Sequence, residues 1–143
     1  MVNAVKWADP TSRATNIAGA SLAAGGNLLS DAIANETNKD RYLALELLFS
    51  NSGTTSTGTF IETYLLYAQD GTNYEDGSAA VDPKKTFDNV FINAGTAAGS
   101  PQRQNIPDIP INPFNFKVLL KSEFTNAISG VTLSAHTYNE EIQ

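Results

Sequence analysis

One stretch constrains the fold more than any other part of this sequence: TFIETYLLYAQDGTNYEDG, from Thr59 to Gly77. Its first half, Phe60 to Tyr67, consists mostly of β-branched and aromatic residues, which suit a pleated, half-buried surface. Gly58 precedes this run and Asp70-Gly71 follows it, and both are turn signals. Alternation leaves apolar side chains on both faces of the run. The pattern therefore predicts a central β-strand that is covered on both sides.

The preceding segment, RYLALELLFS from Arg41 to Ser50, has the composition of a helix but the alternation of a strand. Read with period 2, it places Leu43, Leu45, Leu47 and Phe49 on one wholly apolar face. We interpret it as a strand that is joined by the loop 51–58 to an antiparallel partner. Further strands are predicted at 86–93, 114–122 and 131–139, and a short strand or helical turn at 28–35.

The segment from Pro101 to Pro113, PQRQNIPDIPINP, carries four prolines. Proline removes a donor from the sheet ladder, so this segment is predicted to be an extended edge piece and not a central strand. Its larger apolar side chains, Ile106, Ile109 and Ile111, are the expected anchors.

The N-terminal part, from Thr11 to Asn27, consists of small and polar residues, with Ile17 and Leu22 as its larger apolar groups. Its alanine content is compatible with a helix, but its glycines and the lack of an apolar stripe argue against one. We predict that residues 1–27 form an extended arm or edge strands, with a turn at Gly25-Gly26-Asn27. Trp7 is either a residue at the rim of the core or an intermolecular anchor.

Together these segments predict an all-β fold: an antiparallel, jelly-roll-like β-sandwich of seven or eight short strands with an extended N-terminal arm. A length of 143 residues fits one domain, which we place at 28–143 after the arm. The chain has no cysteine, which excludes disulfides and thiol chemistry.

The formal net charge of −6 argues against nucleic acid as a partner, because an acidic surface repels phosphate. It also disfavours contact with anionic lipid, and no apolar run approaches the roughly 20 residues of a membrane-spanning helix. The N-terminus has no signal-peptide pattern, so synthesis in the cytoplasm without export is expected.

Three kinds of site were considered. Asp70, Asn73, Glu75 and Asp76 are oxygen ligands close enough for Ca²⁺, but their spacing does not fit an EF-hand loop and a tight Asp-Gly turn is the favoured interpretation. The one histidine, His136, falls on a predicted strand, and the chain has no Gly-x-Ser-x-Gly motif to supply a nucleophilic serine. Glu46 and Glu62 are candidates for a carboxylate pair in glycoside hydrolysis, but charged residues on the solvent face of a sheet explain them more simply. We therefore expect no enzyme activity and no cofactor. Glycan stacking is an alternative role for the aromatic rings of Trp7, Tyr64, Tyr67, Tyr74 and Tyr138.

Several segments resemble the small virion proteins of tailed bacteriophages, of the head-decoration or cement type. They are YLLYAQDGTNYEDG (64–77), the small-residue arm before Leu28, the NKDRY entry to a strand (38–42) and INPFNFK (111–117). The resemblance implies a non-enzymatic β-sandwich on the head surface of the virion. Such a protein binds the major capsid protein and itself, often as a trimer, and ties capsid subunits together.

For that role, we selected Trp7, Ile17, Leu22, Ile106, Ile109 and Ile111 as interface candidates. Two alternatives remain at this stage. One is a tail or baseplate protein whose sandwich binds a receptor or glycan, and the other is a free-standing carbohydrate-binding module or small hydrolase.

Overall fold

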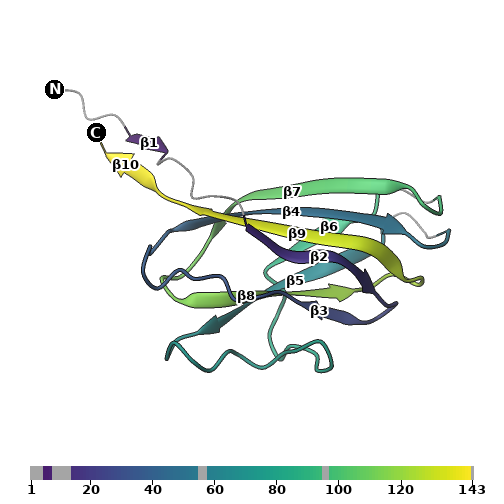
Figure 1. The fold of residues 1–143 in the computed structure, drawn as a ribbon, viewed down its shortest axis with the longest axis horizontal. Helices are drawn as coiled ribbons and strands as arrows, with labels where there is room; N and C mark the ends of the chain where they lie inside the picture. The colour runs from purple at the N-terminus through teal and green to yellow at the C-terminus, as the bar shows by residue number, and fades with distance from the viewer. Residues whose placement is uncertain (1–4, 8–13, 55–57, 95–96, 143) are drawn as a thin grey trace.

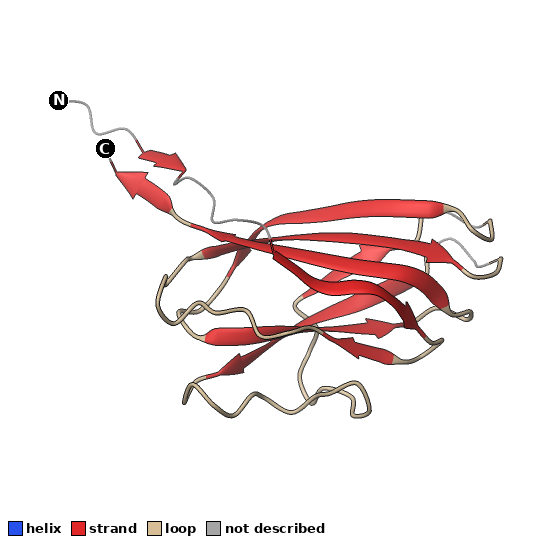
Figure 2. Ribbon diagram, viewed as in Figure 1, coloured by secondary structure: helices blue, strands red, loops and turns tan. Residues whose placement is uncertain are grey.

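The computed structural model describes residues 5–7, 14–54, 58–94 and 97–142, and all of its regular elements are strands (Figures 1 and 2). The strands are β1 (Val5–Trp7), β2 (Ala14–Leu22), β3 (Asn27–Leu29), β4 (Tyr42–Asn51), β5 (Phe60–Ala68), β6 (Asn89–Ile92), β7 (Pro101–Pro110), β8 (Asn115–Ser122), β9 (Ile128–Tyr138) and β10 (Glu140–Ile142).

Eight of these strands form two four-stranded antiparallel sheets, with the orders β2-β9-β4-β7 and β3-β8-β5-β6. The sheets are stacked as two layers, as Figure 2 shows. Apolar side chains from their inner faces make one main core, in which Leu43, Leu45 and Leu47 of β4 lie opposite Leu65 and Phe116 of the other sheet. The predicted all-β sandwich is confirmed.

The strand pairing follows a single rule that identifies the sandwich as a jelly roll. β2 pairs with β9, β3 with β8, β4 with β7, and β5 with β6, so the chain is one long antiparallel ribbon folded back on itself. Contacts of β4 with β9 and of β5 with β8 then roll the ribbon into two sheets. β1 and β10 pair in the same sense and extend the ribbon beyond the sandwich (Figure 1). This is the double-sheet arrangement of jelly rolls.

The two strands that the sequence marked most clearly occur where predicted, but the predicted antiparallel pairing between them is wrong, because β4 and β5 lie in different sheets. β4 alternates strictly between half-buried and buried positions, with Leu43, Leu45, Leu47 and Phe49 inside. β5 is buried on both faces from Tyr64 onward. Its outer face is covered by the long connection to β6, where Gly77 lies against Leu66 and Leu119. A Cβ at Gly77 would come within 3.0 Å of the Leu66 side chain, so this close approach requires glycine.

The proline-rich segment and the N-terminal segment are both edge strands. β7 pairs with β4 alone, and β2 pairs with β9 through three register shifts. Of the two readings of residues 1–27, edge strand is therefore the one the structure shows for residues 14–22. Because β2 belongs to the sandwich, the predicted boundary between arm and domain at residue 27 does not separate two structural units. The turn there spans Ala23 to Gly26, and Asn27 already begins β3.

Antiparallel pairing gathers the connections at two ends of the roll. One end holds the β2–β3, β4–β5, β6–β7 and β8–β9 connections, of which the structure describes residues 23–26, 52–54, 58–59, 93–94, 97–100 and 123–127. The opposite end holds the β3–β4 and β7–β8 connections and the β1–β10 ribbon.

Candidate functional site

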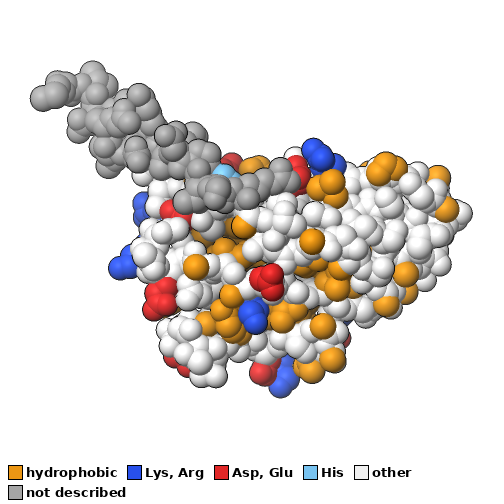
Figure 3. Space-filling model, viewed as in Figure 1, with side chains coloured by type: hydrophobic (Ala, Val, Ile, Leu, Met, Phe, Trp, Pro, Cys, Tyr) orange, Lys and Arg blue, Asp and Glu red, His pale blue; other side chains and the backbone are white. Residues whose placement is uncertain are grey.

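The first of these two ends is almost free of charge. Its four connections read AAGG, SGTTSTGT, NAGTAAGS and EFTNA, and Glu123 is the single charged residue among them. We call this surface, as far as the structure describes it (residues 23–26, 52–54, 58–59, 93–94, 97–100 and 123–127), the uncharged end. In Figure 3 it lies at the right of the view, where the surface is white and orange, whereas blue and red side chains gather elsewhere. In a chain with 24 charged residues (9 Lys and Arg, 15 Asp and Glu), such segregation distinguishes one end from the other.

Hydrogen bonds tie the loops of the uncharged end to one another. The Ser52 N–H donates to the Ala127 carbonyl at 3.1 Å, and the Asn126 side chain donates to the Thr54 carbonyl at 2.6 Å. The Gly99 N–H donates to the Asn51 carbonyl at 2.7 Å. The β4–β5 loop is thus joined to the β8–β9 connection, and the β6–β7 loop to the end of β4.

A second set of contacts fixes the base of the β6–β7 loop. The Gln102 side-chain amide donates to the Asn93 Oδ1 atom at 2.7 Å and its Oε1 atom accepts from the Ala94 N–H at 3.0 Å. The Asn93 amide also donates to the Thr59 hydroxyl at 3.2 Å. Asn93 is 1% exposed, so its bonds are shielded from water. These bonds hold the described parts of the loops to one another and to the ends of the strands.

The acidic segment that the sequence offered as a calcium site is a turn. The Asp70 carboxylate accepts hydrogen bonds from the backbone N–H groups of Thr72 and Asn73 at 2.9 and 2.7 Å, and from the Asn73 amide at 2.6 Å. These bonds, the Asn73 backbone donor first, lower the pKa of Asp70 to about 2. Within the described residues, no group of three or more acidic or histidine side chains is placed to hold a metal ion.

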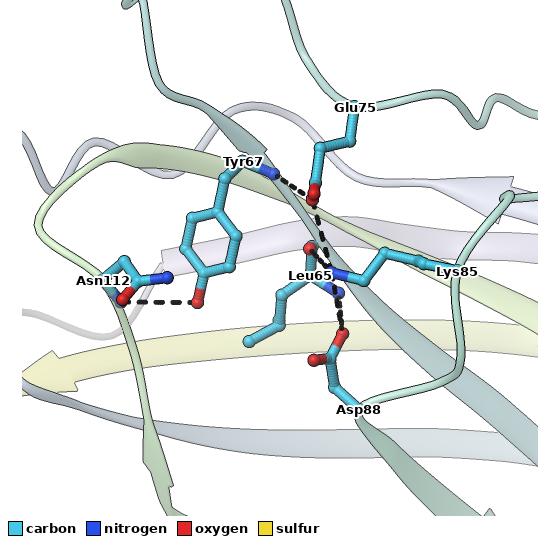
Figure 4. A network of polar contacts seen from close by, with 6 residues as sticks. All are labelled: Leu65, Tyr67, Glu75, Lys85, Asp88 and Asn112. Carbon is cyan, nitrogen blue, oxygen red and sulfur yellow. Dashed lines mark hydrogen bonds and ion pairs between the residues drawn. The ribbon is translucent and has the colours of Figure 1, made fainter.

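The other two members of that candidate set have different roles. Asp76 pairs with Lys84 at 2.9 Å on the surface. Glu75 points back to the sheet, where its carboxylate accepts from the Tyr67 N–H at 3.1 Å and contacts Lys85 at 3.3 Å (Figure 4). The four residues are therefore not arranged around one point.

Glu75 belongs to a polar cluster that closes the open edge of β5. β6 pairs with β5 only from Phe60 to Thr63, so the edge beyond that point lacks a neighbouring strand. The Asp88 carboxylate accepts from the Leu65 N–H at 2.7 Å, and the Lys85 ammonium donates to the Leu65 carbonyl at 2.9 Å. We call Glu75, Lys85 and Asp88 the β5 clamp (Figure 4). It replaces the missing strand with side chains and blocks pairing with another chain.

The predicted interface residues are mostly parts of the core. Ile17, Leu22 and Ile109 are 7%, 1% and 5% exposed, and Ile106 and Ile111 are partly buried against the same core. This corrects the choice of Ile17, Leu22 and Ile109 as surface contacts, because their side chains already hold the two sheets together. The expectation that Ile106, Ile109 and Ile111 anchor the proline-rich segment agrees with this packing. Trp7 lies in β1, but its side chain is outside the described part of the structure.

The aromatic, histidine and glutamate residues that the sequence offered as glycan-binding or catalytic candidates do not come together in one site. The Tyr64 hydroxyl donates to Glu62 at 2.5 Å, and burial followed by this bond raises the pKa of Tyr64. Tyr67 is buried beside Phe116, and Tyr74 lies under the Lys117 ammonium, 4.6 Å from its ring centroid. His136 and Glu46 lie on the outer face of the first sheet. Glu62 is on the other sheet, so the two glutamates do not form a catalytic pair.

Sequence reasoning missed the uncharged end because it searched for large apolar side chains. The available signal was the lack of charge in the loops at 52–59 and 93–100, which only the roll topology shows to be neighbours.

Comparisons with known proteins give no family. No protein-family model matches the chain, and no curated protein matches it. Among solved structures, the chain is similar to one described as the structure of infectious bursal disease virus, Gx strain, with 15% identity and a TM-score of 0.47 over 93% of this chain and 33% of that chain. It is also similar to one described as "CBM4 structure and function", with 12% identity and a TM-score of 0.33 over 86% of this chain and 81% of that one.

This chain thus spans about a third of the viral protein's length. Neither likeness is strong enough to say what this chain does. In the part of the chain that the structure describes, no helix has the length and apolar character needed to cross a membrane.

Proposed function

We propose that this protein is a structural component of a tailed-phage particle: a head-decoration protein that sits on the capsid and bridges its subunits. The observation that carries the proposal is the uncharged end. The cores of protein interfaces are depleted of charged residues, and a protein of net charge −6 that leaves one end uncharged offers a surface for contact with another protein.

The chemistry of that end suits repeated contacts. Gly and Ala lose no side-chain rotamer freedom when a partner covers them, and Ser and Thr lose little, whereas exposed Lys and Glu lose much more. The described parts of the loops are also joined by the Ser52–Ala127 and Asn51–Gly99 hydrogen bonds, so little ordering of these parts remains to be done on binding. Contacts of this kind are weak singly and add up when copies are repeated over a symmetric shell.

The assignment to a phage head, and to the major capsid protein and further copies of this chain as partners, rests on the sequence resemblance. Jelly rolls occur in viral capsid and lectin domains alike, so the fold is compatible with the proposal without selecting it. A tail or baseplate location is the nearest alternative, and a free-standing carbohydrate-binding module is the next. Imaging of labelled protein on particles distinguishes the three by position.

The test uses phage heads that lack the protein, mixed with purified wild-type or variant chains. We expect wild-type protein to bind the head surface in numbers set by the capsid lattice and to delay DNA release on heating. Ala24→Glu with Ala98→Glu places two carboxylates on exposed positions of the uncharged end. Buried unpaired charge at an interface is costly, so this variant should bind at least about tenfold more weakly.

Thr37→Glu is the matched control, since it adds charge at an exposed position of the opposite end. It should bind like the wild type. Heads without the protein that resist heat normally would overturn the bridging role, and equal weakening by both variants would overturn the assignment to the uncharged end.

A further inference from the structure

The connection between β5 and β6, residues 69–88, crosses the outer face of the β3-β8-β5-β6 sheet (Figure 1). We call it the strap. It covers a small apolar cluster of Tyr64, Leu66 and Leu119, and Gly77 lies against the last two. None of the strap's own residues is fully buried. Connections of this length are uncommon in compact domains and are usually functional, and segments with so little burial are the ones that open most readily.

The β5 clamp holds the strap by copying the hydrogen bonds of a strand (Figure 4). In an antiparallel ladder every second residue bonds a given neighbour, and Leu65 and Tyr67 are the two that face the open edge of β5. The Leu65 N–H and C=O bond to the Asp88 carboxylate and the Lys85 ammonium. The Tyr67 N–H donates to the Glu75 carboxylate at 3.1 Å, and the Tyr67 C=O accepts from the Glu75 N–H at 3.1 Å. The four backbone groups that a neighbouring strand would bond are therefore already in use.

The strap itself contains a segment that is in register to take those places. The pairing of β5 with β6 keeps one register over its four residue pairs. Continued toward the N-terminus of β6, this register places Phe87 opposite Leu65 and Lys85 opposite Tyr67. Pro83 is the first residue on that side that cannot donate to a ladder, so the extension of β6 ends before it.

Two observations favour such an extension. The sequence predicts a strand at 86–93, whereas the structure has a strand only at Asn89–Ile92. Phe87, in the part of that prediction that is not a strand, is 49% exposed. In the continued register its side chain would face the same side as Leu65 and Phe91, which are buried in the main core. Burial of this ring would offset part of the loss of the clamp bonds.

We propose that β6 has two lengths: the observed one, with the strap held by the β5 clamp, and a longer one, residues 84–92, paired along β5. In the long form, backbone groups take the places of the clamp side chains. Glu75 then loses both of its bonds to Tyr67, and the first half of the strap is freed from the sheet. Lys85 stays beside the Tyr67 ring, which its ammonium already faces at 5.8 Å from the centroid. Contact with a partner that prefers one form would shift the balance, which makes the strap a regulatory element.

The long form is the minor one in the wild-type chain, because the observed form keeps the charge-assisted bonds of the clamp. Loss of the clamp therefore still lowers the protection of the Leu65 and Tyr67 amides, although the long form bonds them again. Both forms belong to the free protein and are compared without any capsid, so failure of this proposal is distinguishable from failure of the proposed function.

The test is NMR on the isotope-labelled full chain. Lys85→Thr with Asp88→Thr removes two of the three clamp side chains and places β-branched residues in the extension. In this variant we expect a nuclear Overhauser contact between the Hα atoms of Leu66 and Thr86, which the continued register makes a close, non-hydrogen-bonded pair. Unchanged amide shifts in β4 and β9 of the other sheet show that the sandwich is intact. Absence of the Leu66–Thr86 contact in the folded variant overturns the proposal.

A matched pair of further changes separates pairing from general loosening of the strap. Phe87 and Val81 are both exposed strap residues, at 49% and 51%, but only Phe87 lies in the extension. Added to the clamp variant, Phe87→Ser should lower the ratio of long to observed form by at least about fivefold, because the ring no longer gains burial. Val81→Ser should leave that ratio, read from the Leu65 amide shift, unchanged. Equal effects of the two changes overturn the proposal.

Discussion

Leu47 and Leu48 are neighbours in β4 that face opposite sides of the sheet. Leu47 is fully buried in the main core, whereas Leu48 is half-buried and faces outward. Leu47→Ala should lower the free energy of unfolding by about 2–5 kcal/mol, because it removes packed atoms and leaves a cavity. Leu48→Ala should cost well under half of that. Denaturant unfolding of both variants measures the difference, and equal losses would mean that β4 does not alternate as described.

The Asp70 turn gives a residue-scale prediction on pH. The pKa of Asp70 is lowered to about 2, with the Asn73 N–H as the largest cause. A group whose folded pKa is depressed contributes stability that is complete above its unfolded pKa, near 3.9, and is lost as pH falls through about 2. Carbon-13 titration of the carboxyl should therefore give a midpoint near 2 for Asp70. Asn73→Ala removes one donor and should raise that midpoint, and a wild-type midpoint near 3.9 would contradict the turn.

At the scale of elements, a strand could be predicted from the sequence where its own residues show a periodic pattern of bulky apolar side chains. β4 and β5 alternate bulky apolar residues, so their positions and buried faces follow from local sequence. β2 consists mostly of small residues, and only Ile17 and Leu22 of this strand are fully buried. Its partner β9 is more than a hundred residues away in the sequence. Such a strand is specified by its partner and not by its own propensity.

The lack of a local sequence pattern also explains two other differences between the sequence-based expectations and the structure. No strand was predicted after Asn139, but Glu140–Ile142 pairs with the N-terminal Val5–Trp7 as β10. The acidic residues near Asp70 looked like a possible ligand set, but Glu75 is used by the β5 clamp, whose members are up to 13 residues apart in the chain. Neither contact leaves a periodic trace, so local patterns could not predict them.

The β5 clamp gives a prediction on stability at the scale of elements, and the neighbouring Lys84 provides the control. Lys85 contacts Glu75, Asp88 and the Leu65 carbonyl, and its side chain is 28% exposed. Lys85→Ala should lower the free energy of unfolding by about 1–2 kcal/mol, since it removes charge-assisted bonds from a partly shielded site. Lys84→Ala removes a pair whose two side chains are 75% and 67% exposed and should cost less than about 0.5 kcal/mol.

Hydrogen exchange gives the second measurement of the clamp. The Leu65 and Tyr67 amides bond to the Asp88 and Glu75 carboxylates, so their exchange should accelerate in Lys85→Ala and not in Lys84→Ala. Unchanged exchange at both amides would show that the connection 69–88 is held on β5 by packing alone.

For the whole molecule, the decisive feature is that the folded ribbon continues past the sandwich. β1 and β10 pair with each other over three residues each and with no other described strand. An isolated two-stranded ribbon is marginal in water, so its pairing adds little to the stability of the body. Removing residues 1–7 and 140–143 should shift the melting temperature by less than about 5 °C and leave the circular-dichroism spectrum of the sandwich unchanged.

Asn139 must be kept in that truncation, because its side chain accepts from the Arg41 N–H at 2.9 Å and donates to the Asp40 carboxylate at 2.8 Å. A further change of Asn139→Ala should then destabilise the truncated chain by about 1–3 kcal/mol, since both partners lose a bond and Asp40 is buried. A large loss from the truncation alone, with little added by Asn139→Ala, would mean that the ribbon and not the Asn139 contact closes this end of the roll.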